Sequence, residues 1–273
     1  MLKRTLVFSN PMTLSLKNCQ LVLAYKDDPD NKVTIPIEDI GVVIIEHQQV
    51  IITVPLMNAL VEGNNLQGEN LRNQMGAGEV LKKQLWKQIV EAKIRNQAAL
   101  LNKVGQEGDR LKQYYQNVKS GDADNREGIA ARIYFSELFG ESFVRDRTVP
   151  GINALLNYGY AILRAATARA LVSSGLLPAI GIFHHNRSNA FPLADDVMEP
   201  YRPYVDEIVY DMAMQAKLDL TKDVKAELIN VLYADTQFSR VTRPLSVGLT
   251  LTTASLSKCF AKEQTKLSLP FMS

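Results

Sequence analysis

The chain has 273 residues and a formal net charge of +2, and 46% of its residues are hydrophobic and 22% charged. These values are ordinary for a soluble globular protein, and the length suffices for one large domain or two smaller ones. So small a charge does not by itself indicate a nucleic-acid-binding protein, and any DNA-binding surface has to come from local segregation of charge.

Cysteine content and the apolar runs exclude several classes of protein. Cys19 and Cys259 stand alone, which excludes a disulfide framework and a zinc site with Cys/His spacing. Residues 1–4 lack the apolar core of a signal peptide, and the apolar run at 41–45 is far too short to cross a bilayer. We therefore expect a cytoplasmic protein with no membrane partner.

The first sixty residues carry the pattern of β-structure, and the rest of the chain carries the pattern of helices. Alternating, β-branched stretches predict strands at residues 2–8, 20–25, 32–35, 41–46 and 50–54, with a short helix at 55–60. From about Gly78 the apolar period becomes 3.6, which predicts helices at residues 79–103, 125–139, 152–174 and 189–217, the last bent at Pro200 and Pro203. The predicted class is α+β, with a small N-terminal β-sheet domain (1–66) and a larger all-helical domain (76–273).

Two adjacent histidines precede a group of acidic residues. Histidine occurs only at His47, His184 and His185, and Asp196 and Glu199 lie at i, i+3 in the predicted helix that follows the last two. An imidazole beside carboxylates suits Mn²⁺ or Mg²⁺ better than zinc. A solvated acidic helix face behind a polar loop gives the same pattern, and spacing alone favours that second interpretation.

Glu127 lies in the first turn of the helix predicted at 125–139. The helix dipole stabilises a carboxylate at that position, so spacing alone gives it no functional role.

Basic residues are concentrated in one segment. Residues 72–103 hold seven basic side chains against two acidic ones, namely Arg72, Lys82, Lys83, Lys87, Lys93, Arg95 and Lys103 against Glu79 and Glu91. The segment is typical of a phosphate-contacting helix and equally of a solvated surface helix. Arg164, in the alanine-rich helix at 152–174, is equally consistent with an arginine whose charge is satisfied inside the protein and with one that contacts phosphates.

Several segments together resemble the CRISPR-associated spacer-adaptation integrase family, the first of the Cas proteins, in its type II form. The matching segments are LWKQIV with KIRNQA (85–98), DADNREG (122–128), NALLNYGY (153–160), GIFHHN (181–186) and LADDVMEPYRP (193–203), and their order and spacing agree over nearly the whole chain. Family members usually carry a longer insertion where this chain has only residues 62–65. We therefore attach no functional prediction to residues 61–66.

The resemblance implies an N-terminal domain that dimerises and a helical catalytic domain with a Mg²⁺ or Mn²⁺ site. It places the ligands on Glu127, His184 and Glu199, with His185 as the alternative histidine, and puts Asp196 near the metal or the DNA end. Lys82, Lys83, Lys87 and Arg164 are the predicted DNA-binding cations, and Asp196 is grouped with them among the predicted DNA-binding residues.

The reaction implied by the resemblance is the insertion of short foreign DNA, the prespacer, into a CRISPR repeat by a 3′-hydroxyl. The implied partners are double-stranded DNA, a second copy of the chain, the second adaptation protein and the type II RNA-guided effector nuclease. Two other functions remain open on the sequence: a general metal-dependent nuclease and a non-enzymatic dimeric DNA-binding scaffold.

Overall fold

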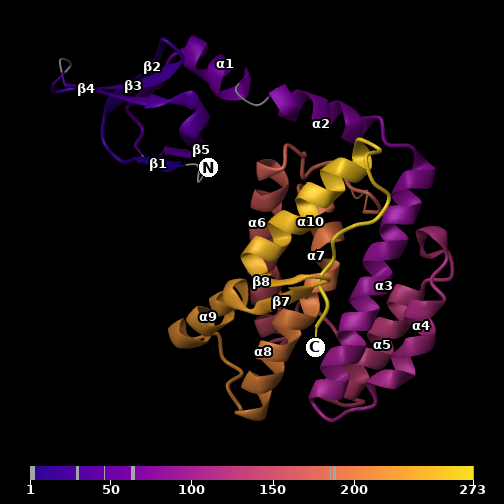
Figure 1. The fold of residues 1–273 in the computed structure, drawn as a ribbon. Helices are drawn as coiled ribbons and strands as arrows, with labels where there is room; N and C mark the ends of the chain where they lie inside the picture. Colours follow the sequence, from indigo (N-terminus) through magenta and orange to yellow (C-terminus); the bar gives the residue numbers. More distant parts are fainter. Residues whose placement is uncertain are drawn as a thin grey trace. The chain divides into compact units, whose positions relative to one another are not determined.

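The computed structural model describes residues 4–28, 31–45, 47–62, 65–184, 186 and 189–272. The chain divides into two compact units, residues 1–69 and 70–273. The first consists mainly of strands and the second mainly of helices, which confirms the predicted α+β class (Figure 1). The predicted domain limits at 66 and 76 and the dimerisation role stay predictions.

Among its described residues, the N-terminal unit contains six strands and a helix. They are β1 (Arg4–Phe8), β2 (Met12–Lys17), β3 (Gln20–Tyr25), β4 (Lys32–Pro36), β5 (Ile40–Ile45), β6 (Val50–Ile52) and α1 (Val54–Glu62), with a 3₁₀ turn, η1 (Ile37–Asp39), before β5. Strands β1 and β5 pair in parallel, and the other four form a sheet in the order β4-β3-β2-β6. Apolar side chains from the strands and α1 pack into one core, centred on Leu14, Leu21 and Leu56.

Strand β2 is the N-terminal element that the sequence prediction missed. It pairs antiparallel with β3 so that only Asn18 and Cys19 remain in the turn, and both have positive φ (51° and 57°). Two left-handed residues in a two-residue loop match the twist of the paired strands, but glycine usually marks such a turn and is absent here. Of the other predicted strand residues, 2, 3 and 46 lie outside the described residues.

The second unit is largely helical, and α2 (Asn65–Met75) crosses the border between the units. The longer helices that follow are α3 (Glu79–Lys103), α5 (Arg126–Phe139), α6 (Ile152–Ser173), α7 (Pro192–Met198), α8 (Arg202–Met214), α9 (Lys222–Ile229) and α10 (Leu245–Phe260). The short elements are α4 (Lys112–Gln116), η2 (Gly108–Leu111), η3 (Ser120–Asp122), η4 (Glu199–Tyr201), η5 (Asn230–Tyr233) and a hairpin of β7 (Asp235–Phe238) and β8 (Val241–Pro244).

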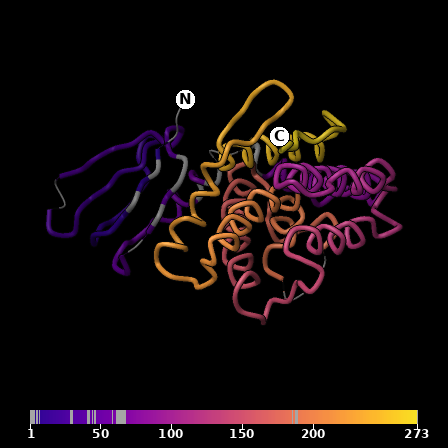
Figure 2. Tube along the Cα trace, turned by 90° about the horizontal axis from the view of Figure 1, so that it is seen from below, coloured from indigo at the N-terminus to yellow at the C-terminus, as the bar shows by residue number. Residues whose placement is uncertain are grey.

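Helix α3 is buried along most of its length, with Leu85, Ile89 and Ile94 fully enclosed. Helices α4 and α5 lie along one side of it, and the segment from α7 to α8 lies against another (Figure 1). The C-terminal segment runs beside α3, as Figures 1 and 2 both show. There the Asn96 amide donates to the carbonyl oxygens of Pro200 (2.7 Å) and Pro270 (3.1 Å).

Helix α6 packs against α7, α8 and α10, and its small residues allow the helices to approach closely. A Cβ atom on Gly159 would lie 2.4 Å from Cγ1 of Val205 on α8. Glycine is therefore required at this crossing.

The predicted helices agree with the structure in place and in most of their limits. The fourth divides into α7, η4 and α8, and Pro200 and Pro203 lie in the first turns of η4 and α8. Helices α2, α9 and α10 and the β7–β8 hairpin were not predicted. In the part of the chain that the structure describes, no helix is both long enough and apolar enough to span a membrane.

Candidate functional site

The first turn of α5 places Glu127. The Asp122 carboxylate accepts hydrogen bonds from the backbone N–H groups of Arg126 (2.8 Å) and Glu127 (3.0 Å). Asn125, with φ of 52°, accepts another from the N–H of Gly128. These side chains satisfy amide donors that a helix start leaves unpaired, and they fix the direction in which Glu127 leaves the backbone.

Glu127 and Glu199 meet at one positive charge. The Lys93 ammonium lies 2.5 Å from Oε1 of Glu127 and 2.6 Å from Oε2 of Glu199. Lys93 is only 6% exposed and comes from α3, so three elements converge on this point: α3, the start of α5 and η4. The sequence analysis counted Lys93 among the basic residues of segment 72–103, which either a phosphate-contacting or a solvated surface helix would explain. Neither interpretation fits Lys93 itself, because its ammonium is enclosed between two carboxylates.

The second oxygen of Glu199 is held separately, since Arg202 Nη2 lies 2.8 Å from Oε1. Burial would raise the pKa of Glu199, but Arg202 and Lys93 hold that pKa below its ordinary value. Burial would likewise lower the pKa of Lys93, yet the charges of Glu199 and Glu127 raise it above the usual value. Glu199, Lys93 and Arg202 are therefore charged at neutral pH.

His184 is oriented by a buried carboxylate. Its Nδ1 atom lies 2.6 Å from Oδ1 of Asp196, and this hydrogen bond raises the pKa of His184. Asp196 is fully buried and also accepts from the backbone N–H groups of Ile182, Phe183 and His184, at 2.6, 3.0 and 3.2 Å. A proton on Nδ1 leaves Nε2 as the nitrogen with a free lone pair.

The site of Asp196 differs from the prediction. The sequence analysis placed it among the DNA-binding residues, but a fully buried carboxylate with four donors around it has no surface to offer to DNA. Its place in the structure is to hold the loop at 182–184 and the imidazole of His184. His185, the histidine adjacent to His184, lies outside the described residues. The choice of His184 over His185 as the ligand therefore stays a prediction.

Aromatic packing supports the other side of the imidazole. The Trp86 ring stacks on Phe183 at 4.3 Å between centroids and meets His184 edge-on at 5.7 Å. Trp86 is 1% exposed. Trp86, although it belongs to the basic segment, therefore points from α3 towards His184 and not towards the solvent.

A cavity of about 960 Å³ opens beside His184. Its lining includes four arginines, Arg145, Arg147, Arg164 and Arg202, and one acidic residue, Asp195. The guanidinium groups of Arg145 and Arg202 lie over the Tyr160 ring, and those of Arg164 over Phe191. A positively charged cavity with aromatic walls suits a phosphate-bearing ligand with flat bases.

The predicted DNA-binding cations fall in two places. Lys82, Lys83 and Lys87 lie on α3, where Lys82 pairs with Glu79 and Lys87 with Glu91, both at 3.6 Å, and Lys83 is exposed. Arg164 lines the cavity and is held by Asp195, with Nε 2.9 Å from Oδ1, and by Asn189. Of the four arginines at the cavity, the sequence analysis named Arg164 and missed Arg145, Arg147 and Arg202.

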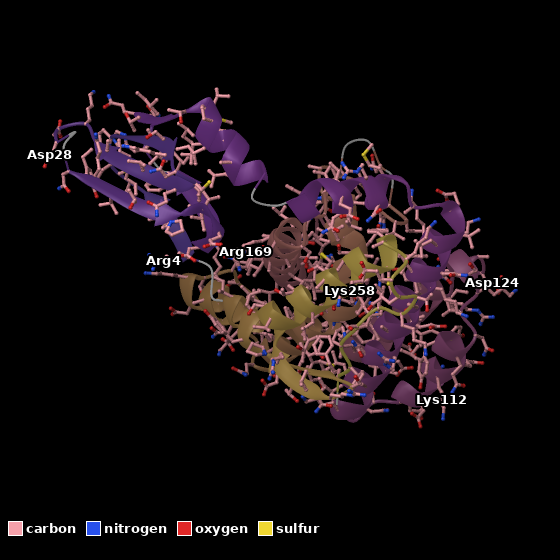
Figure 3. The ribbon with its side chains drawn as sticks, turned by 45° about the horizontal axis from the view of Figure 1, so that its top comes forward. Arg4, Asp28, Lys112, Asp124, Arg169 and Lys258 are labelled. Carbon is pink, nitrogen blue, oxygen red and sulfur yellow. The ribbon has the colours of Figure 1, made fainter. Side chains whose placement is uncertain are left out.

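Several other charged residues of the helical unit lie at its surface. Figure 3 shows Lys112 and Asp124 at the outer edge of the unit, and Lys258 on α10. Asp124 pairs there with Lys119 at 2.8 Å. The buried charges around Lys93 are thus distinct from ordinary surface pairs.

A further buried carboxylate, Asp206, lies behind the cavity wall formed by Tyr160. Asp206 accepts hydrogen bonds from the hydroxyls of Tyr160 (2.5 Å) and Tyr134 (2.8 Å). Burial raises its pKa to about 6.

The donor set fits a hard divalent cation. Two carboxylate oxygens already converge on a cation, and Oε2 of Glu199 is buried without a hydrogen bond of good geometry. Within the described residues, no three His, Cys, Asp or Glu side chains surround one point as a ready-made cage. Lys93 occupies the space between the two glutamates, so its ammonium stands where a metal ion would lie.

Comparisons with known proteins agree with one another. The family model described as CRISPR associated protein Cas1 matches residues 62–243. The CRISPR-associated endonuclease Cas1 of Neisseria meningitidis serogroup C is 40% identical over 263 residues, covering 87% of this chain and 85% of that protein.

Three solved structures share the fold over 97% or more of both chains. A casposase bound to integration product has a TM-score of 0.69 at 19% identity, and a Cas1 protein from Thermotoga maritima has 0.65 at 17%. A chain of a partial Cas6-RT-Cas1–Cas2 complex has 0.61 at 20%. At these identities the likeness concerns the fold alone.

Proposed function

Since the chain belongs to the Cas1 family of CRISPR-associated proteins, we propose that it is a metal-dependent DNA endonuclease and integrase that inserts short foreign DNA into a CRISPR array. The observation that carries this proposal is the convergence of Glu127 and Glu199 on one cation, at the side of the cavity where Asp196 orients His184. A solvated acidic helix face, the competing interpretation of these residues, does not account for a buried Glu199 and a partly buried Glu127 that share one charge.

Glu127, Glu199 and Nε2 of His184 are the proposed ligands of Mg²⁺ or Mn²⁺. Carboxylate oxygens suit both ions, and one imidazole nitrogen is compatible with Mn²⁺ in particular. Bound there, the ion would polarise the scissile phosphate and stabilise the negative charge that grows on it. Asp196 keeps the proton on Nδ1 of His184, so the opposite nitrogen stays available as a ligand.

The proposed reaction is a transesterification. The 3′-hydroxyl oxygen of the incoming duplex forms a bond to a phosphorus of the repeat, the bond from that phosphorus to the repeat's own 3′ oxygen breaks, and the released oxygen takes up a proton as the attacking hydroxyl loses one. No bond to the protein is formed. The arginines of the cavity contribute by binding the phosphates and aligning the two strands.

DNA binding is proposed for the cavity and for the α3 surface. Arg164 at the cavity and Lys82, Lys83 and Lys87 on α3 contact the phosphate backbone and not base edges in this proposal. Binding of this kind depends on salt and tolerates any sequence, as insertion of arbitrary foreign DNA requires.

The partners belong to the same proposal. A solved structure that shares the fold is a chain of a Cas1–Cas2 complex, which supports a second adaptation protein as partner. We further propose a homodimer in the cytoplasm and, from the type II resemblance, contact with the RNA-guided effector nuclease.

The reaction type is tested with short duplexes that carry either a 3′-hydroxyl or a 3′-dideoxy end, mixed with a supercoiled plasmid that contains the repeat. We expect joined products in Mn²⁺ only with the 3′-hydroxyl duplex. Nicking of the plasmid to the same extent with both duplexes, without joining, would indicate a hydrolytic nuclease instead.

A further inference from the structure

One buried ammonium occupies the point at which the proposed metal ligands meet. Lys93 Nζ is 2.5 Å from Oε1 of Glu127 and 2.6 Å from Oε2 of Glu199, and the lysine side chain is 8% exposed. Two carboxylates this close to a common point, one buried and one partly buried, repel each other unless a cation lies between them.

The ammonium and a metal ion need the same oxygen of Glu199. The other oxygen, Oε1, is engaged by Arg202 at 2.8 Å, which leaves Oε2 for a further cation. Mg²⁺ or Mn²⁺ binds carboxylate oxygens at about 2.0–2.2 Å, so an ion on Oε2 of Glu199 and Oε1 of Glu127 would overlap the position of Nζ. Lysine and metal therefore exclude each other at this point.

We propose that Lys93 is a built-in counter-ion that holds the divalent-cation position in the metal-free protein and leaves it when the metal binds. The proposal rests on the proposed function, because it takes Glu127 and Glu199 as metal ligands. It differs from a purely structural salt bridge, in which Lys93 would stay between the two carboxylates whether or not Mn²⁺ is present. The flexible four-carbon stem of lysine allows such a displacement, whereas the shorter carboxylates are fixed by η4 and the capped start of α5.

The measurement is the affinity of the metal-free full-length protein for Mn²⁺, followed by the electron paramagnetic resonance signal of the free ion. Lys93→Met keeps the length of the side chain without its charge, and Lys93→Gln keeps a hydrogen-bond donor without the charge. Lys103→Met is the matched control, since Lys103 lies on the same helix and pairs with Glu207 at the surface. Because a competing positive charge is removed at contact distance, we expect both Lys93 variants to bind Mn²⁺ at least about tenfold more tightly than wild type, with Lys103→Met unchanged.

A second readout keeps the test independent of affinity alone. Without metal, the Lys93 variants leave the Glu127 and Glu199 carboxylates without the ammonium between them, while Arg202 still pairs with the other oxygen of Glu199. We therefore expect lower melting temperatures than wild type and a larger rise on addition of Mn²⁺. A folded Lys93 variant that binds Mn²⁺ with wild-type or weaker affinity overturns the counter-ion proposal.

Glu127→Ala separates the two proposals. If it abolishes Mn²⁺ binding while the Lys93 variants bind like wild type, the metal site stands and the counter-ion proposal fails. If wild type, Glu127→Ala and the Lys93 variants all bind equally weakly, both proposals fail.

Discussion

Replacement of Asp196 by asparagine tests how strictly the imidazole of His184 is held. Asp196 accepts four hydrogen bonds while fully buried: two on Oδ2 from the backbone of Ile182 and Phe183, and two on Oδ1 from the backbone and ring of His184. An asparagine has one oxygen for these four donors, and its amide nitrogen is itself a donor.

Either orientation of the asparagine leaves two donors without an acceptor. If the amide nitrogen replaces Oδ1, the ring of His184 has to move its proton to Nε2, the nitrogen proposed to bind the metal. If it replaces Oδ2, the backbone of the 182–183 loop loses its anchor. Each unsatisfied buried donor costs about 1–3 kcal/mol, so we expect a loss of about 2–5 kcal/mol in the free energy of unfolding. Loss of a carboxylate behind a metal-binding histidine typically weakens metal affinity by about 10–100-fold.

Two assays check this prediction. Unfolding in denaturant is followed by the fluorescence of Trp86, which is the single tryptophan of the chain and lies against His184. Mn²⁺ affinity is measured on the same preparations, with Asp195→Asn as the control because Asp195 pairs with Arg164 instead. Wild-type Mn²⁺ affinity in Asp196→Asn would refute the role given to this carboxylate.

Three further predictions concern stability and DNA binding. The pKa of Asp206 is about 6 in the folded chain and about 3.9 when unfolded, so the folded state keeps its proton longer and stability falls as pH rises from about 4 to 6. Asp206→Asn should remove that slope in denaturant unfolding; equal slopes in both proteins would contradict this. Gly159→Ala should lower stability by about 1–3 kcal/mol, since its methyl group meets Val205, and an unchanged melting temperature would show that the helices can separate at no cost. Arg147→Ala should weaken duplex binding equally for all sequences and reduce the slope of log affinity against log salt by about 1; a sequence-dependent loss would point to base contact instead.

Much of the fold follows from apolar periodicity. The limits of α3 and α5 could be predicted because a 25-residue buried helix and a helix capped by Asn125 leave clear local signals. Strand β2 alternates apolar and polar residues from Met12 to Lys17, so it was predictable from its own pattern, but its turn carries neither glycine nor proline. The C-terminal helices α9 and α10 pack against α6, and the β7–β8 hairpin packs against α10. The sequence does not display these contacts.

The site was only partly accessible from sequence. Family resemblance supplied Glu127, His184 and Glu199, and the structure brings the two glutamates together at one charge. Lys93 could not be predicted as a site residue from the sequence. A lysine among six other basic residues looks like any surface cation until its burial is known. Asp196 was recognised as special, but a single i, i+3 spacing does not tell whether a carboxylate faces DNA, a metal or a buried imidazole.

The most direct test of the metal centre is DNA joining in Mn²⁺ by Glu127→Ala and His184→Ala. The matched controls are Glu137→Ala, which removes a glutamate of α5 that pairs with Arg110, and His47→Ala, which removes a histidine of the N-terminal unit. We predict that both site variants lose joining by about a hundredfold or more while both controls keep wild-type rates, since a metal ion contributes several kcal/mol to stabilising the transition state. Wild-type joining by either Glu127→Ala or His184→Ala would remove that residue from the metal centre and contradict the proposed function as stated.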